Sequence, residues 1–214
     1  MLSVLTRVFV AIATILVAAG ARATPIVTPG VDNADTANVV FNPCDAPIFG
    51  PATMVAGCVN TDHALVVSFT TDLLHEIVAN GGQAKIDAFN PASYSQLKIE
   101  IPGQTFDKLV LNIDSLLDGS VTFSDGVGES GNFPLDASGE NFFTITGGPF
   151  DFIEFRTFPG QSQGDMVVNT QQVRIGGSQI PPVPPTGVPE PGSLLLIGLA
   201  LAALAAVRRK RRPS

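Results

Sequence analysis

Residues 97–113, LKIEIPGQTFDKLVLNI, contain two short runs in which every second residue is apolar. The alternating residues are Leu97, Ile99 and Ile101 in the first run and Leu109, Leu111 and Ile113 in the second. A Pro-Gly pair separates the runs, and such a pair is typical of a turn. Because alternation with a period of two is the pattern of a half-buried strand, this stretch predicts two strands that pack on a core.

The same kind of run recurs along most of the chain, between turn signals such as Asp118-Gly119 and Gly147-Gly148. The predicted strands are residues 39–41, 65–70, 84–89, 94–101, 106–114, 120–124, 141–146, 150–157 and 166–175. Residues 24–57 are otherwise expected to form loops, because they are rich in Pro, Gly, Asn and Asp. Eight or nine strands at this spacing predict an all-β, antiparallel and jelly-roll-like sandwich over residues 24–178.

One segment, residues 71–80, fits two structures. Leu73, Leu74, Ile77 and Val78 cluster at helical spacing, but the segment also reads as a loop and a strand, which we favour.

Fourteen phenylalanines are predicted to fill the space between two sheets. Their dense cluster is Phe142, Phe143, Phe150, Phe152, Phe155 and Phe158. A sugar-stacking platform usually contains Trp or Tyr, which keep a polar group at a wet surface. This chain has no Trp and a single Tyr, Tyr94, so core packing is favoured for the cluster.

The first 23 residues have the three-part plan of a secretory signal peptide. Arg7 precedes an apolar run from Val8 to Ala19, and the triplet Ala21-Arg22-Ala23 stands before Thr24. The run is shorter than the roughly 20 residues that span a bilayer. Cleavage after Ala23 and export of the remainder are therefore expected.

The other end of the sequence predicts a membrane anchor in three parts. Residues 179–191 form a Pro-rich linker that ends in Val188, Pro189, Glu190 and Pro191. Residues 192–207 are uncharged and predict a short transmembrane helix, and residues 208–214 form a basic tail. The basic residues of that tail are Arg208, Arg209, Lys210, Arg211 and Arg212. By the positive-inside rule, the tail lies in the cytoplasm and the body lies outside it.

This order of a Val-Pro-Glu-Pro motif, a Leu/Ala-rich helix and a basic cluster resembles the PEP-CTERM sorting signal of Gram-negative bacteria. The resemblance implies that an exosortase, a membrane-embedded cysteine protease, recognises the tail near its Pro-Glu-Pro sequence. It also implies delivery to the cell surface or the extracellular matrix. A plain tail anchor is the alternative. The body resembles ectodomains attached to such tails, and these are mostly uncharacterised.

Cys44 and Cys58, the two cysteines of the chain, are predicted to form a disulfide. Thirteen residues separate them in a Pro- and Gly-rich stretch, and a metal site would need three or four ligands. A disulfide agrees with export to an oxidising compartment. Free buried thiols are the alternative.

Charge excludes one class of partner. Between Thr24 and Glu190 there are five basic residues against 19 acidic ones, a net charge of −14. Nucleic acids are bound chiefly through Lys and Arg, so nucleic-acid binding is excluded.

No catalytic motif stands out. His63 lies beside Asp62 and His75 beside Glu76, but neither belongs to a nucleophile elbow or a zinc-protease motif. No cofactor is expected. Calcium is the one ligand left open, through the acidic loops at 32–35 and 114–125, although Asp and Asn are also common turn residues.

The sequence therefore predicts an exported, non-enzymatic protein with a structural or adhesive role in the envelope or the exopolysaccharide matrix. A carbohydrate- or calcium-binding module is the alternative, and a secreted hydrolase is a third possibility.

Overall fold

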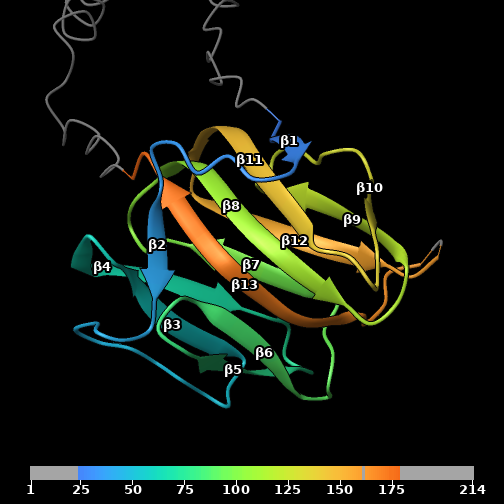
Figure 1. Cartoon of the computed structure of the whole chain (residues 1–214), viewed down its shortest axis with the longest axis horizontal. Coiled ribbons are helices and arrows are strands. Elements are labelled where there is room, and N and C mark those ends of the chain that lie inside the picture. Colours follow the sequence, from blue (N-terminus) through green and yellow to red (C-terminus); the bar gives the residue numbers. More distant parts are fainter. Residues whose placement is uncertain (1–23, 161, 179–214) are drawn as a thin grey trace, which may run out of the picture. The chain divides into compact units, whose positions relative to one another are not determined.

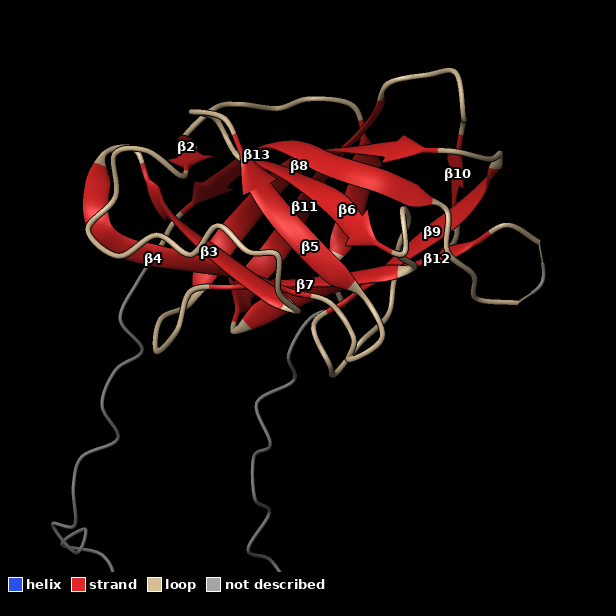
Figure 2. Ribbon diagram, turned by 90° about the horizontal axis from the view of Figure 1, so that it is seen from below, coloured by secondary structure: helices blue, strands red, loops and turns tan. Residues whose placement is uncertain are grey.

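The computed structural model describes residues 24–160 and 162–178, and within them the chain is all-β and antiparallel, as the sequence predicts. Figure 2 shows strands and loops throughout this part of the chain. Among these residues no helix is long and apolar enough to cross a membrane. The predicted signal peptide, linker, membrane helix and basic tail lie outside the described residues.

Two sheets face each other across the core. The first contains β1 (Ile26–Pro29), β11 (Asn141–Phe150), β8 (Phe106–Ser115), β13 (Val167–Gly176), β6 (Lys85–Asn90) and β5 (Glu76–Asn80), in that order. The second contains β3 (Met54–Val59), β4 (Asp62–Thr70), β7 (Gln96–Glu100), β12 (Phe152–Phe158), β9 (Gly119–Ser124) and β10 (Phe133–Leu135). Figure 1 shows β8 and β13 lying across β7 and β12.

Strand β2 (Ala37–Val40) joins the two sheets. Its first half pairs with β13 of the first sheet, through Asn38 and Arg174. Its second half pairs with β3 of the second sheet, through Val40 and Cys58. The sandwich is therefore nearly closed along this side.

The three outermost strands are short or partly covered. β1 has four residues and contains Pro29, and β10 has three residues and contains Pro134. The outer side of β5 is met by a single bridge between Ala52 and Ile77.

The core lies where the alternation placed it. All six alternating residues of the stretch 97–113 are buried in one hydrophobic cluster. Phe123 of β9 lies at its centre, with its ring 5.1 Å from that of Phe143 on the opposite sheet and 6.3 Å from that of Phe155. Tyr94 is fully buried, and its hydroxyl lies 2.8 Å from the Thr170 hydroxyl. The single tyrosine is thus a core residue.

The phenylalanine prediction is correct for half of the dense cluster. Phe143, Phe150 and Phe155 are buried between the sheets, whereas the remaining three are only partly buried. Phe152, for example, lies under the Lys98 ammonium group, which is 4.8 Å from the ring centre. The alternation of side chains explains why some of these phenylalanines are buried and others are not, because neighbouring residues of one strand point to opposite faces of the sheet.

Four predictions about the strands were wrong. The segment 24–57 contains β1 and β3 as well as β2, β10 was missed, and the described part has 13 strands rather than eight or nine. The break predicted at Gly147-Gly148 does not exist, because β11 continues through it to Phe150 with a bulge. A Cβ atom on Gly148 would lie 2.7 Å from Phe106 O, so the bulge requires glycine there.

The segment 71–80 forms a loop followed by β5, as favoured. Leu73 and Leu74 are 91% and 82% exposed, while Ile77 is buried in the core. The helical spacing of these residues was therefore a coincidence.

The described strand pairings and the hydrophobic core lie within one continuous stretch of the chain. Every strand pairing of the described residues falls within residues 26–176, as does their hydrophobic core cluster. The compact unit that contains these strands ends at Ile180. Residues 24–178 thus hold all the described interactions that stabilise the sandwich.

Candidate functional site

The outer face of the first sheet carries a set of polar side chains that we call the amide face. Ile86 and Ala88 of β6, together with Ala84 just before it, pack on the core, so Lys85, Asp87 and Phe89 point outward. The other members of the amide face are Asn80 of β5, Gln171 and Asn169 of β13, and Asn112 and Asp114 of β8.

Strand register places these residues in two rows. Lys85 pairs with Asn80 on one side and with Gln171 on the other, and Gln171 pairs with Asn112. In the second row, Asn169 pairs with both Asp87 and Asp114. Directly paired residues of antiparallel strands have Cβ atoms about 4.5–5.5 Å apart. The rows therefore bring the β5–β6 hairpin together with β8 and β13, which lie far from it and from each other in the sequence.

The charged groups of the amide face are paired within it. The Lys85 ammonium group lies 3.0 Å from a carboxylate oxygen of Asp87, whose other oxygen accepts a hydrogen bond of 2.6 Å from the Asn80 amide. Asp114 accepts a hydrogen bond of 3.0 Å from the Gln171 amide. These bonds hold the Asn80 and Gln171 amides through their N–H groups.

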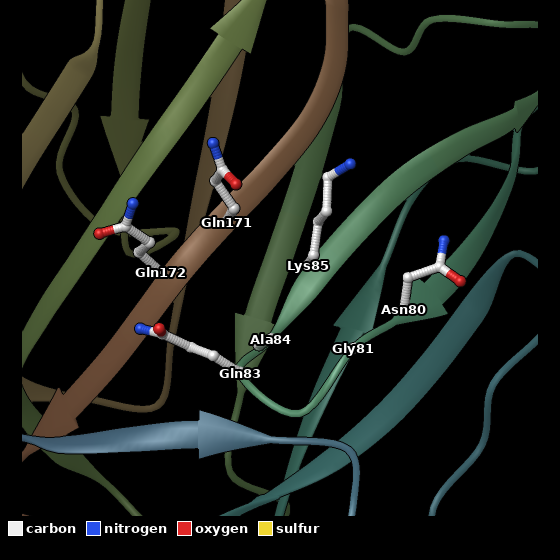
Figure 3. Close-up of a pocket in the computed structure, with 7 residues that line it drawn as sticks. All are labelled: Asn80, Gly81, Gln83, Ala84, Lys85, Gln171 and Gln172. Carbon is white, nitrogen blue, oxygen red and sulfur yellow. The ribbon is translucent and has the colours of Figure 1, made fainter.

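At one end of the face lies a pocket of about 320 Å³. Its lining includes Gln83 and Gln172 beside Asn80, Lys85 and Gln171, as Figure 3 shows. The pocket forms where β13 bulges. Gln172 has φ +55°, a left-handed conformation that is strained for a residue with a side chain, and its backbone N–H donates to Ala84 O at 3.1 Å.

Two oxygen atoms of this face are buried without a hydrogen-bond donor. They are Oδ1 of Asn112, which is 1% exposed, and Oδ1 of Asn169, which is 8% exposed. An unsatisfied buried polar atom costs about 1–3 kcal/mol. Native structures contain few such atoms, and each calls for an explanation.

A second polar cluster lies around His75, which is 6% exposed. Its Nε2 lies 2.9 Å from an oxygen of Asp165, and its Nδ1 bonds to Asp72. Burial of the ring opposes protonation, but the bonds to Asp165 and Asp72 outweigh it and raise the pKa of His75 above its ordinary value. The cluster holds the loop that presents Leu73 and Leu74.

We expect this His75 cluster to make stability depend on pH. Because the pKa of His75 is raised in the folded state, its contribution is fully present below the unfolded pKa of about 6.5 and is lost as pH rises through the folded pKa. Replacing His75→Gln should remove this component and cost about 1–2 kcal/mol at pH 6. Urea unfolding between pH 5 and about 9 measures both effects. An unchanged pH profile in His75→Gln would contradict the assignment.

The described residues that the sequence singled out for calcium have other partners. Asp32 bonds to Lys108 at 2.7 Å, Asp118 accepts the Ala137 N–H, and Asp125 accepts the N–H groups of Val127 and Gly128. Over residues 24–160 and 162–178, no three His, Cys, Asp or Glu residues gather in a way that could hold a metal ion.

The two predicted cysteines do form a disulfide. Cys44 and Cys58 are bonded, with their Cα atoms 5.6 Å apart. His63 is exposed at the start of β4 and does not approach His75, which lies beyond the far end of the same strand.

Sequence reasoning missed the amide face. The one available signal was that polar residues interrupt otherwise apolar strands, as Asn112 does in LVLNID. That signal says nothing about which other strand lies alongside.

Comparison with known proteins bears on the part of the chain beyond the described body. No curated protein matches the chain. No solved structure matches it either. Residues 187–212 match a family model described as the PEP-CTERM protein-sorting motif. The match covers the Val-Pro-Glu-Pro sequence, the predicted membrane segment and the basic cluster.

This motif implies an exported protein of Gram-negative bacteria that is processed at the membrane and recognised by an exosortase. The chain therefore carries a PEP-CTERM sorting motif, which follows an antiparallel β-sandwich body in the sequence.

Proposed function

We propose that this protein is delivered to the cell surface or the extracellular matrix, where its body has a structural or adhesive role and no catalytic one. The observation that carries the proposal is the PEP-CTERM motif at residues 187–212 on the same chain as a disulfide-closed body. Disulfides persist in oxidising compartments, which agrees with a working place outside the cytoplasm.

The state of the histidines supports a non-catalytic role. A general base needs a free ring nitrogen within reach of the proton that it removes. Both ring nitrogens of His75 are bonded to carboxylates, those of Asp72 and Asp165, which favour the protonated ring. His63 has no hydrogen-bonded carboxylate or nucleophile among its described contacts.

The mature termini test the proposed sorting. Peptide mass spectrometry of the protein from the surface fraction of its native cells is expected to find an N-terminus at Thr24. It is also expected to find that the sequence from about Pro191 onward has been removed. A surface protein that keeps Arg208 to Arg212 would refute processing and favour a plain tail anchor.

A pair of matched variants makes this test specific. Glu190→Ala changes the carboxylate of the Pro-Glu-Pro sequence and should leave the basic tail attached. Glu140→Ala changes an exposed carboxylate of the body and should be processed normally. Equal processing of both variants would show that the processing enzyme does not recognise the Glu190 carboxylate.

One observation favours a second candidate, a carbohydrate-binding module. It is the amide face, whose side chains are fixed by hydrogen bonds and whose free groups face solvent.

A further inference from the structure

We propose that the amide face binds an uncharged polysaccharide, through a segment that enters the pocket beside Gln172 and continues along the two polar rows. The inference deepens the proposed adhesive function and rests on it for the place where the polymer is met. It assigns the binding to one face of the first sheet.

The free hydrogen-bonding groups of the face match hydroxyl groups. The Asn80 and Gln171 amides use an N–H for neighbouring carboxylates and keep their carbonyl oxygens available. Gln172 makes no side-chain hydrogen bond among the described residues, so it offers both a donor and an acceptor. A hydroxyl group can donate one hydrogen bond and accept two, so it satisfies both the amide donors and the carbonyl acceptors.

The buried oxygens indicate a ligand that donates hydrogen bonds. Oδ1 of Asn112 and Oδ1 of Asn169 lack donors, and register places them beside Gln171 and Asp114 respectively. Because both oxygens are buried, a sugar hydroxyl would reach them through a bridging water, which donates the missing hydrogen bond.

An apolar ring stands next to the polar rows. Phe89 lies two residues beyond Asp87 on the outward side of β6 and is 54% exposed. Its ring is an apolar surface that the C–H face of a sugar residue can contact, without the polar group that Trp or Tyr would add. Core packing, which explains the buried phenylalanines, does not explain this one.

Charge selects against acidic polymers. Lys85, the cation of the face, is already paired with Asp87, and Asp114 adds a further negative charge. Residues 24–178 contain five basic residues against 18 acidic ones, a net charge of −13. An anionic polysaccharide would therefore be repelled, whereas an uncharged one meets no such penalty.

The size and position of the pocket suit one part of a longer chain. A volume of about 320 Å³ lies at the small end of the range for ligand pockets, about 300–1,000 Å³. The rows continue from it across β13 to β8. A polysaccharide can therefore place one sugar unit in the pocket and the adjoining sugar units along the amide face.

The test is a binding titration of residues 24–178 against a panel of soluble polysaccharides, with native-gel retardation followed by calorimetry. The panel contains uncharged glucans, mannans and galactans, together with acidic polyuronates. We expect retardation by at least one uncharged polymer and by none of the acidic ones. Binding should also be insensitive to salt from about 0.01 to 1 M, because no charged contact is involved.

Two variants locate the site. Gln171→Ala removes an amide from the centre of the first row and should weaken binding at least tenfold. Gln172→Gly removes a second amide at a φ that glycine adopts without strain, so it should weaken binding while the fold keeps or gains stability. The matched control is Asn132→Ala, which removes an exposed amide before β10, on the second sheet.

The proposal is overturned if no uncharged polymer binds, if acidic polymers bind instead, or if Gln171→Ala and Gln172→Gly bind as tightly as Asn132→Ala. This assay is independent of sorting. If no polymer binds but the C-terminus is processed, the amide-face proposal fails and the proposed surface delivery stands. If the body binds a polymer but the protein keeps its C-terminus, surface delivery by processing fails and the amide-face proposal stands.

Discussion

Replacing Phe123→Ala is expected to lower the free energy of unfolding of the body by about 3–5 kcal/mol. Phe123 is fully buried, and its ring contacts those of Phe133, Phe143 and Phe155. Phe143 belongs to the opposite sheet, so the cavity would open between the two sheets, where rigid strands limit collapse around it. Urea unfolding of residues 24–178 measures the loss.

The matched control for this prediction is Phe89→Ala. That residue is a phenylalanine of the same sandwich but is more than half exposed, so its removal should change stability by less than about 1 kcal/mol. Equal losses in the two variants would mean that Phe123 is not the centre of the core. A small change in stability would also mean that the Phe89→Ala variant stays folded and can be used in the binding assays.

Removing the disulfide, in the double variant Cys44→Ala and Cys58→Ala, should cost about 3 kcal/mol. The bond closes a loop with a sequence separation of 14, and the chain-entropy model assigns about that value to a loop of this size. Between β2 and β3 this segment has no regular strand and is held by isolated bridges such as Ile48 to Ala56. Without the crosslink, this segment would keep only these bridges, its backbone hydrogen bonds to β5 and the contact between the Phe49 and Phe41 rings.

Unfolding in urea with and without a thiol reductant checks this prediction. The wild-type body should lose stability on reduction, and the double variant should not respond. If reduction left the unfolding midpoint of the wild type unchanged, the crosslink would contribute nothing to stability, and the loop would be held by its packing alone.

Local sequence patterns predicted the strands that have one apolar and one polar face. The run LKIEI became β7 with its adjoining residue, and KLVLNI became most of β8, because the burial of alternate side chains fixes both the period and the face. β1 and β10 were missed since each is an edge strand of three or four residues containing proline. β3 was missed because Gly57 and Cys58 break its pattern.

The amide face shows why a site of this kind stays hidden in a single sequence. Lys85 and Asn80 are joined by a hairpin and could have been paired from the sequence. Gln171 and Asn112 reach the same row only through long-range register, and nothing local in either segment specifies that partner. The bulge at Gln172 was equally invisible, because glutamine is not a residue that favours a positive φ.

The near-closure of the sandwich by β2 also bears on how the protein behaves at high concentration. An open sheet edge is a template for pairing with another chain and hence for aggregation. Here β2 covers one side, and the edges that remain are short, interrupted by Pro29 and Pro134, or met by the bridge from Ala52. A protein built in this way can accumulate to high local concentration and still remain a set of separate, folded units.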